Sequence, residues 1–239
     1  MSRIASPLDP TGVKDLQETD EFTERLRQEI LEGGLPRGDR LPPEREMAQR
    51  FGISRARLRQ ALDRLEAEGT VFRRRGQGTF VQPPPATDAA RLKSLSARVS
   101  LQEVMEVRFE IEPALAGLAA QRADTRAGEV LAQAAQATLE AADQQSYDLA
   151  DDIFHYKIAE MAQNPLFLTV YEAIRTVRAQ ANWAEKRAQT YAPETTRLLA
   201  QQHQVLLAAI LKGEAVAAKA AMKAHLTFVA DALLQNLPD

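Results

Sequence analysis

The sequence predicts a mostly α-helical protein with two domains, an N-terminal winged helix-turn-helix domain and a C-terminal all-α bundle of six or seven helices. Three observations lead to this fold class. The chain has 239 residues, enough for two domains that each bury a core. Aromatic residues make up only 5% of the chain and glycine occurs only 11 times, a composition that favours helix over sheet. A proline-rich stretch, "PPPATDAARL", separates a basic first part from an acidic second part.

The first part carries the elements of a winged helix-turn-helix in the expected order. In "DEFTERLRQEILEGGL" apolar residues at helical spacing predict a first helix that stops at Gly33-Gly34. "PPEREMAQRFG" predicts a short second helix, because proline is tolerated at the first helical position and Gly52 ends the run. Ser54 is placed to cap a third helix, which closes at Gly69. "TVFRRRGQGTFVQ" then predicts two short strands around a glycine-rich tip.

We place the two domains at residues 1–82, including an N-terminal arm over 1–19, and at residues 93–239, with a linker over 83–92. Proline, glycine, Asn and Asp punctuate the second domain and divide it into helices. The expected helices are Leu101–Arg122, Arg126–Asp143, Tyr147–Gln163, Pro165–Gln189, Pro193–Lys212 and Glu214–Asn236, with a short extra turn near Ser94–Val99. Helices of this number and length pack as a bundle.

Charge and composition narrow the classes of function. Residues 36–82 contain 11 Lys or Arg against 6 Asp or Glu, a balance of +5, whereas residues 83–239 contain 15 against 19, a balance of −4. A basic segment in a chain of net charge −3 is typical of a polyanion-binding module, and a solvated charged surface explains it equally well. The absence of cysteine excludes a disulfide framework, and no apolar run matches a signal peptide or a membrane span. We therefore expect a cytoplasmic protein with no membrane partner.

Arginines at the start of the third helix are the candidate DNA-reading residues, because this helix enters the major groove in a helix-turn-helix. Arg55 and Arg59 are four residues apart and share one helix face, so both reach the same groove. Arg57 points away from them, toward phosphate or solvent. The planar fork of arginine makes two bonds to guanine or clamps a phosphate, which suits this task.

Two other parts of this domain are expected to lie against DNA. Arg45, one turn into the preceding helix, faces the DNA backbone, and Arg73 to Arg75 with Gly76 form a wing near the minor groove. Any one of these arginines alone is an ordinary solvated side chain. Together, in this order of elements, they indicate a DNA-binding domain.

The stretch "ILEGGLPRGDRLPPEREMAQRFGISRARLRQALDRLEAEGTVFRRRGQGTFV" resembles the DNA-binding domain of the GntR family of bacterial transcriptional regulators over nearly its whole length. The resemblance implies DNA contacts by Arg45, Ser54, Arg55, Arg57, Arg59, Arg75 and Gly76. Arg57 departs from the family pattern, which often has a smaller residue at this position. A winged helix reads few base pairs, so we expect a homodimer on a palindromic double-stranded operator.

The segment "DDIFHYKIAE" places Asp151 and His155 four residues apart, a spacing that lets both side chains hold one ion. The chain has only three histidines, and the other two, His203 and His225, lie in mid-helix beside aliphatic residues. A histidine in such a place is more often a core residue than a ligand. However, all three fall on separate predicted helices of one bundle, and bundle cores build metal sites from facing helices.

The segments "RFEIEPALAGLAA", "DDIFHYKIAEMAQNPLF", "QQHQVLLAAILKGEAVAA" and "AMKAHL" resemble successive signatures of the FCD ligand-binding domain, found in the FadR subfamily of GntR regulators. The resemblance implies a divalent metal held by Asp151, His155, His203 and His225. We expect zinc first, with nickel, iron or manganese as alternatives, because imidazole and carboxylate suit them all. Such a centre attracts a small chelating carboxylate, and the resemblance implies organic acids as effectors.

Arg108, in "EVRFEIE", matches the first helix of that domain. It clamps a carboxylate oxygen of the effector or forms an ion pair with Glu112, four residues on, and both alternatives stay open. The prediction is a ligand-responsive regulator and not an enzyme, with repression relieved by the ligand as the expected sign. One alternative is a metal site that only stabilises the bundle. The other is a metal-dependent hydrolase, which the lack of an HExxH pattern disfavours.

Overall fold

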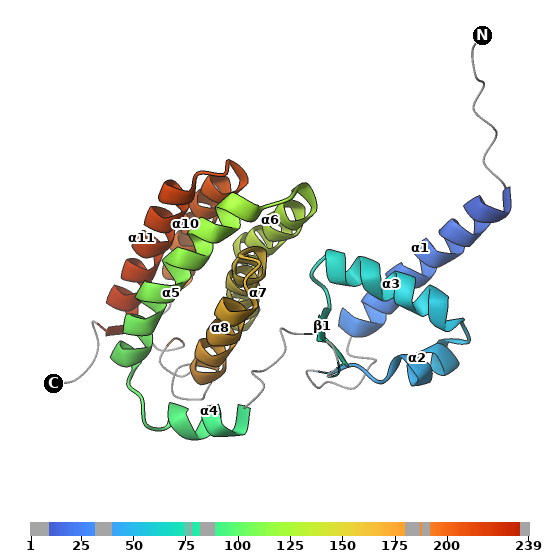
Figure 1. Cartoon of the computed structure of the whole chain (residues 1–239), viewed down its shortest axis with the longest axis horizontal. Helices are drawn as coiled ribbons and strands as arrows, with labels where there is room; N and C mark the ends of the chain where they lie inside the picture. Colours follow the sequence, from blue (N-terminus) through green and yellow to red (C-terminus); the bar gives the residue numbers. More distant parts are fainter. Residues whose placement is uncertain are drawn as a thin grey trace, which may run out of the picture. The chain divides into compact units, whose positions relative to one another are not determined.

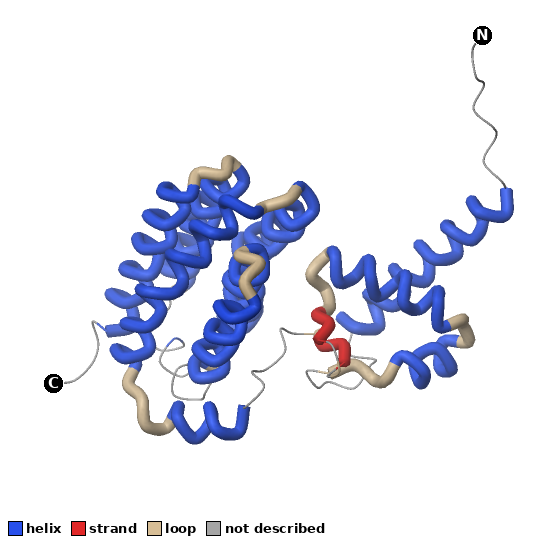
Figure 2. The backbone as a smooth tube through the Cα atoms, viewed as in Figure 1, coloured by secondary structure: helices blue, strands red, loops and turns tan. Residues whose placement is uncertain are grey.

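The computed structural model describes residues 10–31, 40–74, 76, 78–81, 89–179, 187 and 192–234. The chain divides into two compact units, Met1–Pro84 and Pro85–Asp239, and each is described by itself. Figure 1 traces the elements of both units, and Figure 2 shows that helix forms most of the described chain. Within those residues the only sheet has two strands. The mostly α-helical fold class is confirmed.

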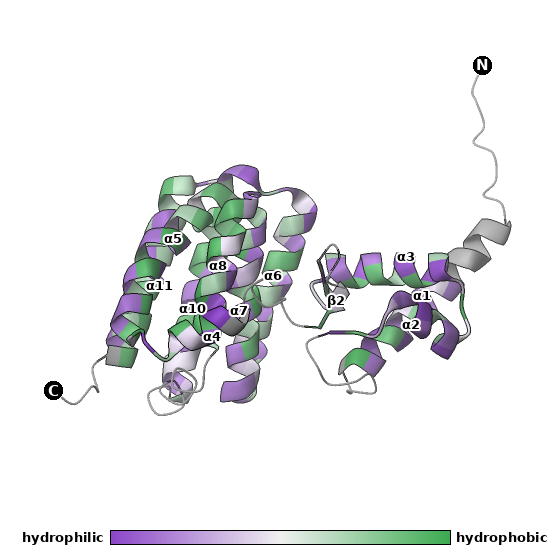
Figure 3. Ribbon diagram, turned by 60° about the horizontal axis from the view of Figure 1, so that its bottom comes forward, coloured by the Kyte–Doolittle hydropathy of each residue, from purple (hydrophilic) through white to green (hydrophobic). Residues whose placement is uncertain are grey.

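The N-terminal unit contains three helices, α1 (Pro10–Leu31), α2 (Glu44–Phe51) and α3 (Arg55–Ala67). Helix α1 begins well before the stretch that predicted it, inside the segment expected to be an arm. Pro10 occupies its first position, where proline is tolerated because its missing N–H has no helical partner. Figure 3 shows hydrophobic and hydrophilic positions alternating along α3, as expected for a helix with one buried face. The core residues of the unit include Phe22, Leu26, Leu58, Leu62, Leu65 and Val71.

A sharp turn between α2 and α3 sets the helix-turn-helix. Gly52 follows α2 with a φ of +66°, in the left-handed region that favours glycine. Ser54 then caps α3 as predicted, and its hydroxyl oxygen accepts a hydrogen bond from the Arg57 backbone N–H at 3.2 Å. The cap fixes the first turn of α3, which carries the arginines.

The predicted hairpin forms from β1 (Phe72–Arg74) and β2 (Gly78–Phe80), paired antiparallel with Phe72 opposite Phe80. The backbone N–H of Leu41 donates to the Thr79 carbonyl at 2.7 Å, which ties the hairpin to the segment before α2. Gly78 has a φ of +113°, and a Cβ there would lie 2.7 Å from Arg40 Nε. This position therefore requires glycine.

The C-terminal unit is an all-helical bundle. Its helices within the described residues are α4 (Ala89–Ser96), α5 (Leu101–Arg122), α6 (Thr125–Glu140), α7 (Gln144–Met161), α8 (Pro165–Arg178), α10 (Pro193–Leu211) and α11 (Ala215–Leu234). These seven helices agree with the expected six or seven. Helix α4 begins inside the stretch expected to be linker, and α8 ends at Arg178, well before the predicted Gln189. Most of the residues between α8 and α10 lie outside the described part of the chain.

Helix α5 is central to the bundle, where it packs against α7, α8, α10 and α11. A capping box fixes its first turn: the Ser100 hydroxyl accepts from the Glu103 backbone N–H, and the Glu103 carboxylate accepts from the Ser100 N–H at 2.7 Å. Asp143 and Ser146 form the same reciprocal cap at the start of α7. The packing of α5 against its neighbours brings α7, α10 and α11 together inside the unit. Over the residues that the structure describes, no helix has the length and apolarity needed to cross a bilayer.

Candidate DNA-reading surface and metal centre

The two arginines expected to enter the major groove are exposed at the start of α3. Arg55 and Arg59 lie one turn apart on the same helix face, and Arg45 is exposed on α2. Gly76 is exposed at the tip of the hairpin with a φ of +76°, whereas Arg75 lies outside the described residues. This arrangement is suited to DNA contact, and the individual contacts stay predictions.

Arg57 takes part in an ion pair that the sequence did not indicate. Its Nη2 lies 3.0 Å from Glu18 Oε2 on α1, so the side chain does not simply face solvent. The pairing depends on the crossing of α1 over α3, which no local sequence pattern reports. A phosphate contact by Arg57 stays a prediction, and such a contact would compete with the ion pair to Glu18.

Glu44 holds the guanidinium of Arg59. Arg59 Nε donates a hydrogen bond to Glu44 Oε2 at 2.8 Å. Glu44 is the first residue of α2, where the helix dipole stabilises a carboxylate. This bond occupies Nε and leaves the Nη edge of the guanidinium to pair with guanine or phosphate. We expect Glu44 to position Arg59 for DNA.

The Glu44→Gln variant tests this positioning. We expect operator affinity to fall about 5-fold, because a charge-assisted hydrogen bond that orients Arg59 is weakened. Affinity for non-specific DNA should rise slightly, since one negative charge is removed near the phosphates. Competition binding at constant salt, with operator against unrelated DNA, measures the ratio of the two affinities. Glu46→Gln removes the same charge from the same helix end, and a fall in its ratio as large as that of Glu44→Gln would contradict the positioning role.

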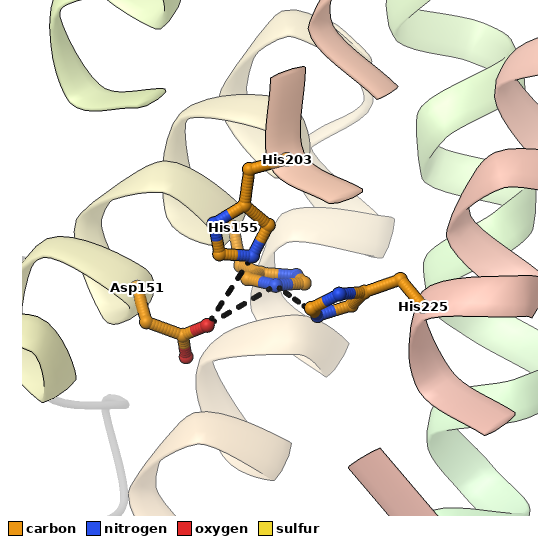
Figure 4. Close-up of side chains that lie close together, drawn as sticks. All are labelled: Asp151, His155, His203 and His225. Atoms are coloured by element: carbon orange, nitrogen blue, oxygen red, sulfur yellow. Dashed lines mark hydrogen bonds and ion pairs between the residues drawn. The ribbon is translucent and has the colours of Figure 1, made fainter. Parts of the chain in front are cut away.

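The four predicted metal ligands meet inside the C-terminal unit, as Figure 4 shows. Asp151 and His155 come from α7, His203 from α10 and His225 from α11. One donor atom from each residue lies within 4.8 Å of the others. His155 Nε2 is 3.3 Å from His225 Nε2, while Asp151 Oδ1 is 3.6 Å from His155 Nε2 and 3.4 Å from His203 Nε2. The three histidines are at most 2% exposed.

Two of these rings have a hydrogen-bond acceptor close to Nδ1, on the side of the ring away from the cluster. His155 Nδ1 lies 3.0 Å from Glu112 Oε2, and an ionised carboxylate can only accept. His225 Nδ1 lies 3.1 Å from the amide oxygen of Gln202, which also only accepts. Protonation of both residues at Nδ1 would satisfy these acceptors and would leave each Nε2 lone pair available to a metal ion.

The third histidine has the same tautomer for a different reason. The hydroxyl of Thr138 donates its own proton to the Ala135 carbonyl at 2.7 Å. Thr138 Oγ1 can then only accept from His203 Nδ1, which lies 3.2 Å away. His203 Nε2 thus also carries a lone pair, and it has no hydrogen-bond partner among the described residues.

Burial and neighbouring charges set the protonation of the cluster. Burial lowers the pKa of His203, and burial together with the other two histidines lowers the pKa of His225 well below its usual value. Burial alone raises the pKa of Asp151, but nearby positive charge, including that of the buried Arg178, outweighs it and holds that pKa well below the ordinary range. Neutral imidazoles and an ionised carboxylate facing one another are suited to a divalent cation, so the donor set fits a metal.

Two arginines lie beside carboxylates at the cluster, and only Arg108 was expected there from the sequence. Arg108 Nε donates to Glu112 Oε1 at 2.5 Å, and both side chains are buried, so the intradomain ion pair is the alternative that forms here. An effector contact by Arg108 stays a prediction. Arg178, near the end of α8, lies with Nη2 3.4 Å from Asp151 Oδ2. A basic residue in the last turn of a helix is common, so no sequence pattern indicates that this one is buried.

The Thr138→Val variant tests the outer partner of His203. We expect metal affinity to fall roughly 10- to 100-fold, because losing the acceptor behind a ligand histidine frees its tautomer and orientation. Thr176→Val is the matched control, since Thr176 also bonds to a helix carbonyl, that of Glu172 at 2.7 Å, on another helix. Titration against a coloured metal chelator measures both variants. Equal metal affinities for the two variants would show that Thr138 does not support the site.

Two family models match the chain: bacterial regulatory proteins of the gntR family over residues 19–81, and the FCD domain over residues 103–228. The chain is 36% identical to an Escherichia coli regulatory protein named for the L-lactate dehydrogenase operon, over 88% of this chain and 84% of that protein. It is 32% identical to the Uxu operon regulator of Haemophilus influenzae, over 84% and 76%. LutR of Bacillus subtilis is 28% identical over 85% and 95%.

A solved structure of E. coli McbR/YncC is similar in fold, with a TM-score of 0.51 and 19% identity over 91% of this chain and 97% of that chain. The matched domains and the named relatives are those of transcriptional regulators, not of enzymes. The chain therefore belongs to the GntR family of bacterial transcriptional regulators, with the C-terminal FCD domain of the FadR-like subfamily.

Proposed function

We propose that this regulator is a homodimeric repressor that leaves a palindromic operator when a small organic acid binds at a metal centre in its helical domain. The observation that carries the proposal is the convergence of three Nε2 lone pairs and the Asp151 carboxylate at one buried place. These acceptors repel one another unless a cation lies between them. We place this regulation in the cytoplasm, where the operator DNA lies.

The ligand set supports zinc first, with nickel, iron or manganese as alternatives. With one carboxylate and three neutral imidazoles, a bound divalent ion would carry a charge of about +1 and offer open positions to a chelating anion. The E. coli relative is named for an operon of L-lactate dehydrogenase, and lactate carries a hydroxyl beside its carboxylate. This name supports a 2-hydroxy or 2-oxo acid as the class of effector for the present chain.

Different residues of the chain are proposed to hold the ion and to bind the acid. Glu112, Gln202 and Thr138 orient the three histidines through their Nδ1 atoms. Arg178 adds positive charge beside Asp151, and Arg108 is predicted to attract the effector carboxylate. An acid that binds one arrangement of the dimer better than the other shifts operator affinity by about 5- to 150-fold, the usual range of allosteric coupling.

Calorimetry with the metal-loaded and the chelated protein tests the proposal. The expected result is that L-lactate, glycolate or pyruvate binds only the loaded protein and releases it from its operator. A metal that serves only structure predicts a different pattern, in which chelation lowers the melting temperature but no acid binds either form. If chelation changes neither the fold nor the affinity for any acid, the effector-site proposal fails.

A further inference from the structure

One hydroxyl group in the C-terminal unit is buried without a partner. Tyr171 of α8 is 0% exposed, and its phenolic oxygen has no hydrogen-bond partner within the described part of the chain. Its neighbour Tyr156, with a ring centroid 6.4 Å away, is also buried but donates to Glu172 Oε1 at 3.2 Å. An unpaired buried hydroxyl is costly and uncommon. The contrast indicates that the described part of the chain leaves room at Tyr171 for a hydrogen-bond partner from a bound molecule.

The surroundings of Tyr171 are those of the metal cluster. Burial first, and then the Glu112 carboxylate, raise the pKa of Tyr171, so the phenol keeps its proton and can donate it in a hydrogen bond. Glu112 also lies 3.0 Å from the ligand His155. Arg178 is seven residues along α8 from Tyr171, two turns on the same helix face, and it lies 3.4 Å from the ligand Asp151. Helix α8 packs against both α5 and α7, which carry these partners.

The charge around the hydroxyl restricts what its partner can be. Tyr171 donates, so the missing group must be an acceptor. Arg178 and Arg108, at 5% and 1% exposure, lie near the hydroxyl together with the carboxylates of Glu112 and Asp152. The two guanidinium groups supply the positive charge that a carboxylate acceptor needs. An oxygen of a small carboxylate meets both conditions, whereas an apolar ligand or an ammonium group meets neither.

We propose that Tyr171 is a specificity-determining residue of the effector site, whose O–H donates a hydrogen bond to a carboxylate oxygen of the bound acid beside Arg178. This inference rests on the proposed function, because it assumes that an acid binds at the metal cluster. A 2-hydroxy or 2-oxo acid uses two oxygens for chelation and keeps one carboxylate oxygen free. Tyr171 pairs with that third oxygen. Acids without this free carboxylate oxygen, or with the oxygen in another position, should therefore bind less well.

The Tyr171→Phe variant tests the inference through the melting temperature, which should not fall, and the affinity for the acid, which should fall. In the metal-free protein its melting temperature should equal or exceed that of the wild type, because the variant removes an unpaired hydroxyl. In the metal-loaded protein its affinity for the best-bound acid of L-lactate, D-lactate, glycolate and pyruvate should fall roughly 10- to 100-fold. Its metal affinity should stay unchanged. The matched control, Tyr156→Phe, should lower the melting temperature and leave acid affinity intact.

The outcomes separate this inference from the proposed function. If the wild-type metal-loaded protein binds none of the four acids, both are rejected. If the wild type binds an acid and Tyr171→Phe binds it equally well, only the role of Tyr171 is rejected. A drop in melting temperature of Tyr171→Phe as large as that of Tyr156→Phe would show that the hydroxyl has a partner within the chain, and would also overturn the inference.

Discussion

Replacing Arg55 and Arg59 together with alanine is expected to lower operator affinity by at least about 30-fold, because each arginine that pairs with a base edge contributes substantially to discrimination. Both side chains are exposed on one face at the start of α3, and the Ser54 cap fixes the turn that carries them. The affinity for unrelated DNA should fall much less, since phosphate contacts by other residues remain. Fluorescence anisotropy at one constant salt concentration, with the selected operator and an unrelated duplex, measures both losses.

A double variant in the other unit provides the control for the change in net charge. Arg91→Ala with Arg126→Ala removes two positive charges from exposed positions on α4 and α6. This variant should keep operator affinity within about 3-fold, because both positions lie outside the unit that carries α3. The assignment of α3 as the DNA-reading helix is wrong if the Arg55 and Arg59 double variant retains its preference for the operator.

Metal binding is expected to raise the melting temperature of the wild-type protein by about 5 to 10 °C when free metal is a hundred times its dissociation constant. The Asp151→Asn variant should lose this shift, because it removes the only charged ligand of the cluster and the charge that balances the ion. His225→Ala should lose it as well, since it removes one of three Nε2 donors. Thermal unfolding with zinc and after chelation measures the shift for each variant.

Asp152 offers a matched control one residue away. Its carboxylate accepts a hydrogen bond from Arg175 Nε at 2.7 Å and is not part of the cluster. Asp152→Asn changes the same charge on the same helix, yet it should retain the metal-dependent shift. A wild-type melting temperature that does not respond to zinc, nickel, iron or manganese would exclude a metal centre at these residues.

The sequence predicts the positions that depend on local spacing. Asp151 and His155 are one turn apart on a helix, so their common face follows from the 3.6-residue period. Ser54 and Gly52 likewise fix the start of α3 and the end of α2 by conformational preferences that act within a few residues. The positions of His203 and His225 beside that pair depend on how the bundle packs. Only the resemblance to the FCD domain predicted that the four residues meet.

Contacts made across helices could not be predicted in this way. Glu112 lies 43 residues before His155, and Thr138 lies 65 before His203, so their meeting depends on how α5, α6, α7 and α10 cross. Arg59 and Glu44 pair across the turn between α2 and α3, and Arg57 reaches α1. Helix crossings are set by the fit of whole side-chain surfaces, which a single sequence does not display.

The capped start of α5 has a consequence for how the C-terminal unit can move. A helix of 22 residues is a rod of about 33 Å, and its capping box at Ser100 and Glu103 keeps the first turn from fraying. Glu112 sits at the middle of this rod and contacts His155. Any tilt of α5 about that point therefore swings the Ser100 end in the opposite direction to the Arg122 end. A tilt of α5 at the histidine cluster would therefore also move α4, which precedes the first turn of α5 in the chain.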